Sequence, residues 1–215
     1  MNTLIILLSN GLFGYYAIIN EVGIGYVLLT FLIEGLFFAF FSHRRIKKIK
    51  NFSVKDMKVN GQNLEKEDTS PENQAHFFLF LSVFSFGIVS MFLFVALFTE
   101  QGSELGLVYK HDNYIYLFIL MFFLSSYFKY KQDIEKDKKR EILLSTMFSL
   151  GIIRAFVFVP IIIFGPMIFQ SQGGEMNTDS VLIIFFIFIK VFLVDFPSQG
   201  MNVYTENEIK TDNNI

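Results

Sequence analysis

The sequence has no cysteine, and in 215 residues it has only four prolines and three histidines. Without cysteine there is no disulfide framework, no thiolate nucleophile and no cysteine-ligated metal. The histidines, His43, His76 and His111, are dispersed and form no H-E-x-x-H pattern. No serine stands in a Gly-x-Ser-x-Gly setting, and no glycine-rich loop is present to hold phosphate. We therefore expect no cofactor, and an enzyme is the less favoured class of function.

A strong charge of one sign is also missing, because 18 Lys and Arg stand against 20 Asp and Glu, for a net charge of -2. A nucleic-acid-binding protein would carry an uncompensated basic surface, so we expect no nucleic-acid partner. What is abundant is apolar: 53% of residues are hydrophobic and 29 are Phe. This composition is typical of a membrane protein. The Phe surplus also fits the codon bias of an AT-rich genome, and that alternative stays open.

Six apolar runs approach or exceed the length needed to cross a hydrocarbon core about 30 Å thick, which takes about 20 helical residues. The runs cover residues 3–19, 23–42, 76–98, 114–128, 142–169 and 181–196. Backbone groups must be paired inside lipid, and the alternation expected of barrel strands is missing. The sequence therefore predicts an all-α, polytopic integral membrane bundle of six transmembrane helices within residues 1–200.

The first two runs must be separated by a turn near residues 20–23, because one continuous helix would be about 60 Å long. The first run is short and contains Ser9, Asn10, Gly11 and Gly14. A re-entrant segment is therefore an open alternative to a full span for this run.

The third helix has a clear start signal in Ser70-Pro71-Glu72, where a capping hydroxyl precedes a proline and an acid. We expect that helix to begin there, before it enters the membrane. In the fifth run, Pro160 and Pro166 each remove a backbone hydrogen bond, which predicts a kink in its outer half.

Orientation follows from the basic residues between the runs. Residues 43–75 hold eight Lys and Arg and residues 129–141 hold six, whereas the connections on the other side hold only Lys110. By the positive-inside rule both basic segments, and with six helices both termini, lie in the cytoplasm of a bacterial cell, with the protein in its cytoplasmic membrane. The polar composition of residues 43–70 predicts a flexible cytoplasmic loop, and residues 201–215 are expected to be a disordered cytoplasmic tail.

The stretch "HRRIKKIK" stands just inside the second helix. We expect Arg44, Arg45, Lys47 and Lys48 to contact anionic lipid headgroups there. A nuclear-localisation or nucleic-acid patch is the less favoured interpretation. A protein partner or a homo-oligomer stays open.

Three charged residues fall near the bilayer midplane. Glu34 and Lys190 lie about 16 and 14 Å from the outer side, and Arg154 about 18 Å from the cytoplasm. Each costs about 2.5–3.5 kcal/mol at a helix centre, so we expect the three to meet and offset one another. Asp195 lies nearer the cytoplasm, within reach of Lys190. The candidate polar cluster is therefore Glu34, Arg154, Lys190 and Asp195.

Several functions are compatible with this cluster. We favour a non-enzymatic membrane component or interaction partner, in which the charges fix the helix register. The alternative is a small carrier or channel, and two positive charges against one negative would suit an anionic solute, unless Asp195 balances them. The third is a membrane-embedded enzyme, which would need His43, His76 and Asp195 to converge around a metal or a substrate.

Three segments, "LLTFLIEGLFFAFFSHRR", "FSLGIIRAFVFVPIIIFG" and "LIIFFIFIKVFLVDF", together resemble an uncharacterised prokaryotic domain-of-unknown-function family of small multi-pass membrane proteins. The resemblance covers most of residues 23–200. It implies that Glu34, Arg154, Lys190 and Asp195 match the charged positions of that family. Ser82 and Ser85 stand where the family pattern has His, and no His follows Arg154, so histidine-dependent chemistry is doubtful here. The resemblance implies no activity.

Overall fold

The computed structural model describes residues 3–55, 57–59, 62–63, 70–98, 115–157, 159–160, 178–195 and 203–208. These residues are mostly helical, as the sequence predicts. The helices are α1 (Thr3–Ile19), α2 (Ile24–Ile46), α3 (Pro71–Phe98), α5 (Ile115–Asp137), α6 (Leu144–Phe156) and α8 (Thr178–Ile189), which continues into the π-helical segment η1 (Lys190–Asp195).

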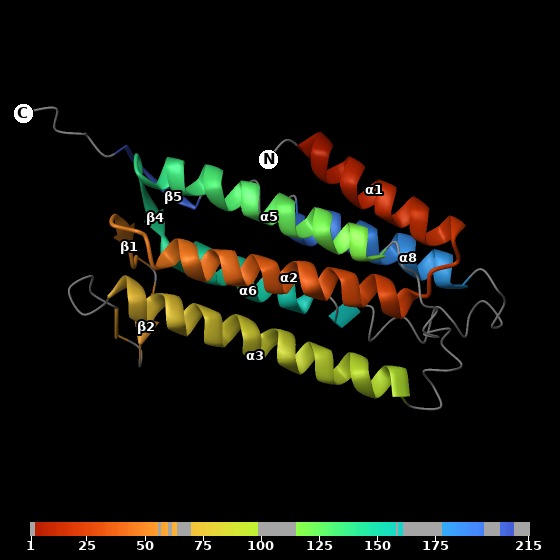
Figure 1. Cartoon of the computed structure of the whole chain (residues 1–215). Coiled ribbons are helices and arrows are strands. Elements are labelled where there is room, and N and C mark those ends of the chain that lie inside the picture. The colour runs from red at the N-terminus through yellow and green to blue at the C-terminus, as the bar shows by residue number, and fades with distance from the viewer. Residues whose placement is uncertain are drawn as a thin grey trace, which may run out of the picture.

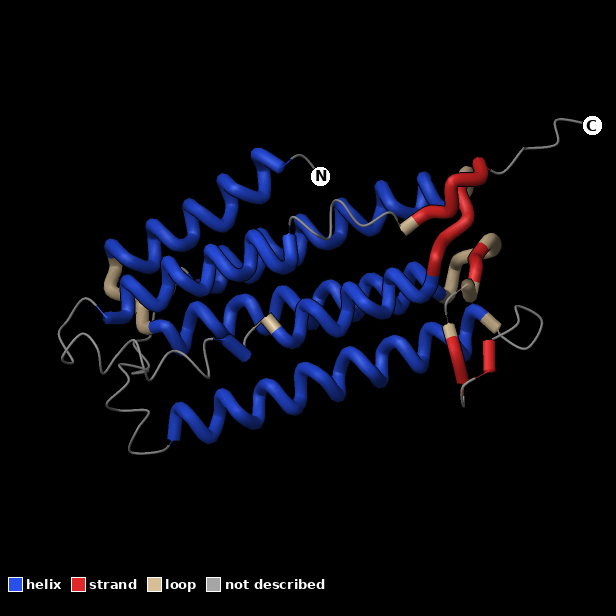
Figure 2. Tube along the Cα trace, turned by 180° about the vertical axis from the view of Figure 1, so that it is seen from behind, coloured by secondary structure: helices blue, strands red, loops and turns tan. Residues whose placement is uncertain are grey.

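Helix α2 is central in the bundle. It packs against α3, α5, α6 and α8, while α1 packs against α8 and η1. Figures 1 and 2 show the helices lying side by side, with the short strands gathered at the end where α2 finishes and α3 begins. The turn between α1 and α2 lies at the opposite end of the bundle.

Two predicted helix ends are confirmed. Between α1 and α2 the chain turns at residues 20–23, where Glu21 adopts a φ of 52° and the Val22 amide donates to the Ala17 carbonyl over 2.8 Å. At the start of α3, Ser70 Oγ accepts the amide of Asn73 over 3.2 Å, and Pro71 is the first helical residue. Both ends follow from local chemistry, because a left-handed residue closes the first and a side-chain cap opens the second.

The prediction of an entirely helical chain is wrong at the end of the bundle where α2 finishes and α3 begins. A three-stranded sheet has the order β1 (Phe52–Ser53), β4 (Arg140–Leu143) and β5 (Tyr204–Glu208), and β2 (Lys58–Val59) pairs with β3 (Gln62–Asn63). Strand β4 pairs parallel to β1 and antiparallel to β5. The expectations of an unstructured loop over residues 43–70 and a disordered tail over 201–215 are corrected at these strands. The pairing of β1, β4 and β5 joins segments far apart in sequence, so composition alone does not reveal it.

Helix lengths also differ from the apolar runs. Helix α2 extends to Ile46, and α5 continues nine residues beyond the run 114–128. Charged residues form helix about as readily as apolar residues do. A helix can therefore continue where the apolar run ends. Helix α6 begins at Leu144 and ends at Phe156, four residues before Pro160. Within the run to residue 169, residue 158 and residues 161–169, with Pro166, lie outside the described residues.

The surface of the bundle is rich in large apolar side chains. They include Phe77, Phe80, Val83, Phe84 and Met91 on α3, and Leu117, Leu120, Met121 and Phe128 on α5, all of which are exposed. Two described helices, Ile24–Ile46 and Pro71–Met91, are long and apolar enough to cross a membrane, and two shorter apolar helices are Leu144–Phe156 and Ser180–Phe192. An apolar exterior of this extent is uncommon in soluble monomers.

Candidate functional site

The four charged residues predicted to form a cluster do come together in the described structure. Glu34 comes from α2, Arg154 from α6, and Lys190 and Asp195 from η1. A fifth residue, Asn10 of α1, joins them. We call these five residues the central charge cluster.

Lys190 is the most firmly held member. Its ammonium donates to Asp195 Oδ2 and to Asn10 Oδ1, each over 2.9 Å, and lies 3.2 Å from Glu34 Oε2. It also stands 4.6 Å from the centre of the Phe31 ring, close enough for a cation–π contact. Asn10 donates in turn to Asp195 Oδ2 over 3.2 Å. The side chains of Lys190 and Asp195 are only 6% and 5% exposed, so this pair is shielded from solvent.

The π-helical turn is what allows Lys190 and Asp195 to pair. Five residues of α-helix at 3.6 residues per turn would leave the two side chains about 140° apart around the axis. A π-helix is wound more widely, with hydrogen bonds from i to i+5, so residues five apart lie much closer together around the axis than in an α-helix. Such turns are frequent at functional sites, and this one places a salt bridge in the interior.

Arg154 is held differently. Its Nη1 lies 4.0 Å from Glu34 Oε1 and its Nη2 lies 3.9 Å from Asp195 Oδ1, so both contacts are ion pairs beyond hydrogen-bond distance. Within the described part of the chain, its buried Nε has no hydrogen-bond partner. The guanidinium instead lies 4.3 Å from the centre of the Phe38 ring. A buried guanidinium whose Nε–H donor has no acceptor is costly, because that donor has lost its water.

The central charge cluster is formally neutral. Glu34 and Asp195 balance Arg154 and Lys190, with Asn10 adding an uncharged bridge. Asp195 thus balances the excess positive charge expected from Glu34, Arg154 and Lys190. The net charge of the cluster therefore does not by itself favour an anionic ligand.

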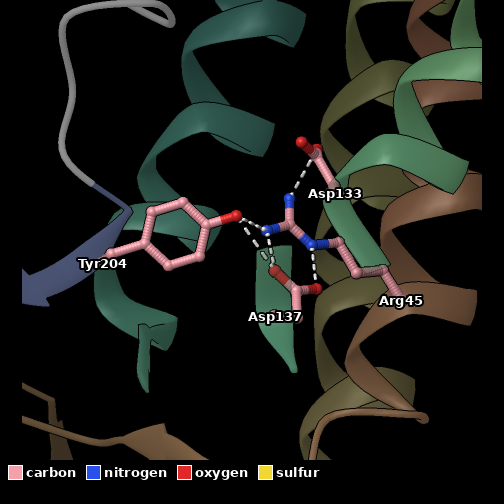
Figure 3. A network of polar contacts seen from close by, with 4 residues as sticks. All are labelled: Arg45, Asp133, Asp137 and Tyr204. Atoms are coloured by element: carbon pink, nitrogen blue, oxygen red, sulfur yellow. Dashed lines mark hydrogen bonds and ion pairs between the residues drawn. The ribbon is translucent and has the colours of Figure 1, made fainter. Parts of the chain in front are cut away.

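A second polar cluster, not predicted from the sequence, lies at the strand-bearing end. Figure 3 shows Arg45 of α2 facing Asp133 and Asp137 of α5 and Tyr204 of β5. Arg45 Nε and Nη2 donate to the two oxygens of Asp137 over 2.7 and 2.6 Å, and Nη1 donates to Asp133 over 2.8 Å. We call these four residues the Arg45 cluster. This fork geometry is the strongest form of a carboxylate–guanidinium pair.

Tyr204 completes the Arg45 cluster. Its hydroxyl accepts from Arg45 Nη2 and donates to Asp137 Oδ1, each over 3.1 Å. Burial raises the pKa of Tyr204 above its ordinary value, and the nearby Asp137 adds to this, although Arg45 opposes it. The hydroxyl therefore stays protonated and keeps donating at physiological pH.

The four basic residues expected to contact headgroups have different surroundings. Arg45 is buried and pairs with the two aspartates, so its guanidinium is turned into the protein. Arg44 and Lys48 are exposed beside aromatic rings, while Lys47 pairs with Glu72 over 3.1 Å. Adjacent residues on a helix point about 100° apart, which is why one arginine turns inward and its neighbour outward.

The histidine site expected for an embedded enzyme is not assembled. The rings of His43 and His76 are tilted by 56° with centroids 5.4 Å apart, but Asp195 belongs to the central charge cluster. His43 Nδ1 bonds the Ala75 carbonyl over 2.9 Å, which ties α2 to α3. Among the described residues no group of three His, Asp or Glu side chains is placed to hold a metal ion.

Comparison with protein-family models, with curated proteins and with solved structures finds no match for this chain. The resemblance of its three charged segments to an uncharacterised membrane-protein family therefore stays a prediction.

Sequence reasoning missed Asn10 and the whole Arg45 cluster. In the sequence, Asn10 is only one polar residue in a short apolar run, although a buried amide needs partners and so indicates polar neighbours. Asp133 and Asp137 are four residues apart, the spacing that places them on one face of a helix. That spacing would have identified them had α5 been extended beyond residue 128.

Proposed function

We propose that this chain is a six-span protein of a bacterial cytoplasmic membrane, with both termini in the cytoplasm. We favour a non-enzymatic role, as a membrane component or interaction partner. In this proposal the central charge cluster fastens α1, α2, α6 and α8 to one another inside the bilayer.

The apolar exterior supports the membrane part of this proposal. Exposed Phe, Leu, Ile and Met side chains occur on α1, α2, α3, α5 and α8, while the charged side chains of the central charge cluster point inward. Charged residues inside membrane helices almost always face the bundle interior, for the same reason that apolar ones face lipid. The strands and the basic segments lie at one end of the bundle, in keeping with a cytoplasmic end.

The single observation that carries the fastening role is the environment of Lys190. Its ammonium has three close oxygen partners, one from α1, one from α2 and one from η1. Two of these oxygens, Asn10 Oδ1 and Asp195 Oδ2, accept hydrogen bonds from the ammonium, and the third, Glu34 Oε2, forms an ion pair with it over 3.2 Å, so Lys190 joins three elements. A residue bound in this way fixes helix positions.

The test is a double-mutant cycle on Lys190→Met and Asp195→Asn in lipid nanodiscs, read as the free energy of unfolding. Each single substitution leaves a buried charge without its main partner and should cost about 3–5 kcal/mol. The double variant should cost clearly less than the sum of the two.

A matched control is the pair Lys138 and Glu135, which are 2.7 Å apart but exposed. The cycle on Lys138→Met and Glu135→Gln should give a coupling below about 1 kcal/mol. If Lys190→Met and Asp195→Asn leave the protein as stable as the parent, the fastening role is refuted.

A carrier for a small anionic solute is the second proposal, and it is supported by Arg154. Unlike Lys190, this residue has carboxylates only at 3.9 and 4.0 Å. Its guanidinium retains hydrogen-bonding capacity that a ligand could use.

A further inference from the structure

The imidazole rings of His43 and His76 lie beside each other at the strand-bearing end of the bundle, where α2 finishes and α3 begins (Figure 1). His43 is in the last turn of α2 and His76 in the second turn of α3, and the ring centroids are 5.4 Å apart. The His43 side chain is partly buried, whereas that of His76 is 59% exposed. A small ion can therefore reach the pair without any opening of the bundle.

A hydrogen bond fixes which nitrogen of His43 is protonated. Its Nδ1 lies 2.9 Å from the carbonyl oxygen of Ala75, and a carbonyl only accepts, so Nδ1 carries the hydrogen. In the neutral ring, Nε2 is then unprotonated and has a lone pair that can bind a cation. The same bond holds the ring of His43 next to His76, the residue that follows Ala75. Histidines that bind metal ions usually donate their other ring N–H to a carbonyl or a carboxylate in this way.

A carboxylate lies beside the second ring. Glu72, one helical turn before His76 on α3, has its Oε1 3.8 Å from His76 Nε2 and 3.1 Å from Lys47 Nζ. Its negative charge favours a cation at the neighbouring imidazole, whereas the ammonium of Lys47 competes for the same oxygen. The surroundings of the histidine pair thus contain one group that favours a bound cation and one that opposes it.

The spacing of the two rings suits a single bound ion. A ring nitrogen lies about 1.2 Å from the ring centre and a zinc–nitrogen bond is about 2.0–2.1 Å long, so each ring centre would be about 3.2 Å from the ion. Two such rings at a tetrahedral angle have centres about 5.2 Å apart. The distance of 5.4 Å between the centroids of His43 and His76 is close to that value. The separation of the rings therefore allows one ion to join them.

We propose that His43 and His76 bind a divalent transition-metal ion such as Zn²⁺ between the end of α2 and the start of α3. Within the described part of the chain no third His, Asp or Glu is placed to complete the site, so water fills the remaining positions. Imidazole suits Zn²⁺, Cu²⁺ and Ni²⁺, whereas Mg²⁺ and Ca²⁺ prefer oxygen ligands. The ion would fasten α2 to α3 at the strand-bearing end, independently of the central charge cluster.

The experiment titrates zinc chloride against the full chain, free of any polyhistidine tag, in nanodiscs of a zwitterionic lipid. Calorimetry measures the stoichiometry and the Kd, and thermal unfolding measures the shift in Tm. The parent should bind one Zn²⁺ per chain with a micromolar Kd. It should also gain thermal stability, because an ion that binds only the folded state stabilises that state.

Two substitutions each remove one imidazole. His76→Gln changes an exposed side chain, so this variant should fold like the parent. His43→Asn keeps an N–H donor near the position of Nδ1 for the Ala75 carbonyl but removes Nε2. Each should weaken Zn²⁺ binding about tenfold or more, since the loss of a ligand costs at least as much as the loss of a ligand's hydrogen-bond partner.

Lys47→Gln should have the opposite effect. It removes the ammonium that competes for Glu72, so Zn²⁺ should bind several times more tightly. Lys48→Gln is the matched control, because Lys48 is the next residue and its ammonium lies 5.9 Å from the centre of the Tyr130 ring on α5. Lys48→Gln should bind Zn²⁺ like the parent.

A spectroscopic measurement counts the imidazoles. Cu²⁺ replaces Zn²⁺, and electron spin echo modulation detects the remote nitrogen of each imidazole bound to it. The parent should show two imidazoles, and His43→Asn and His76→Gln at most one each. A single imidazole in the parent, the absence of saturable Zn²⁺ binding below the millimolar range, or binding that both histidine substitutions leave unchanged would overturn the proposal. None of these results would bear on the fastening role of Lys190.

Discussion

Arg44 and Arg45 are neighbours in sequence, but they point to different faces of α2 and make different contacts. Arg44 is exposed, with its guanidinium 5.3 Å from the centre of the Phe40 ring. Arg45 is buried and bonds Asp133, Asp137 and Tyr204. The sequence presents the two as equivalent members of a basic stretch, but only Arg45 links α2 to α5 and to β5.

Replacing Arg45 by Lys keeps the charge but loses the planar fork. An ammonium cannot bond both oxygens of Asp137 and also reach Asp133 and Tyr204 with the same geometry. Each lost charged hydrogen bond is worth about 1.5–3 kcal/mol, so Arg45→Lys should lower the free energy of unfolding by at least one such amount. Denaturant unfolding in nanodiscs measures the loss.

Arg44→Lys is the matched control, and its change should stay within about 0.5 kcal/mol, as for most surface substitutions. Equal effects of the two substitutions would show that the Arg45 cluster contributes nothing particular to stability.

The central charge cluster was accessible to sequence reasoning because each member is conspicuous. A charge in an apolar run has few acceptable environments. The presence of Glu34, Arg154 and Lys190 in such runs therefore predicts that they lie close together. Arg45 gave no such indication, because a charge at the membrane boundary is satisfied equally well by water, lipid or protein. Asn10 was missed for a related reason, since a neutral amide costs less to bury and points to no definite partner.

At the scale of elements, glycines allow two helices to approach closely. A side chain at Gly35 of α2 would overlap the ring of Phe86 on α3, and one at Gly151 of α6 would come within 2.9 Å of Phe78. Phe86 is only 2% exposed, so its ring has no free space to move into. Small residues at helix crossings let backbones pack closely, which matters in lipid because no hydrophobic force drives helices together there.

Gly35→Ala should therefore destabilise the bundle by about 1–3 kcal/mol, the usual penalty for overpacking a tight contact. Gly87 of α3 provides the control, because a side chain there meets nothing within 4 Å. Gly87→Ala should raise stability by up to about 1 kcal/mol through helix propensity. Thermal unfolding of both variants, and of Gly35→Ala combined with Phe86→Leu, decides the matter. A stabilising Gly35→Ala would contradict the close packing of α2 against α3.

The elements themselves were predictable to different degrees. Apolar runs and the start signal at Ser70 locate the helices well, because both are local properties of the chain. Strands β1, β4 and β5 are two to five residues long and exist through pairing between distant segments, which no local pattern records. The π-helical turn at η1 was equally hidden, since its apolar residues suit an α-helix just as well.

At the scale of the whole molecule, the bundle is divided along its length. One end carries the strands, the Arg45 cluster and most of the basic residues, and the other carries the turn between α1 and α2. The middle buries the central charge cluster within helices whose outer faces are apolar. Such an order along one axis is expected of a protein that meets water, lipid and water in succession.

The proposed topology can be tested directly, because the chain has no cysteine of its own. Single cysteines are introduced at three exposed positions, Asn20 in the turn after α1, Lys55 after β1 and Lys139 before β4. A membrane-impermeant thiol reagent should label Asn20→Cys in intact cells. It should reach Lys55→Cys and Lys139→Cys only after permeabilisation, because the basic segments are held inside. The opposite pattern would reverse the orientation. Labelling of all three in intact cells would refute a bundle that spans the membrane.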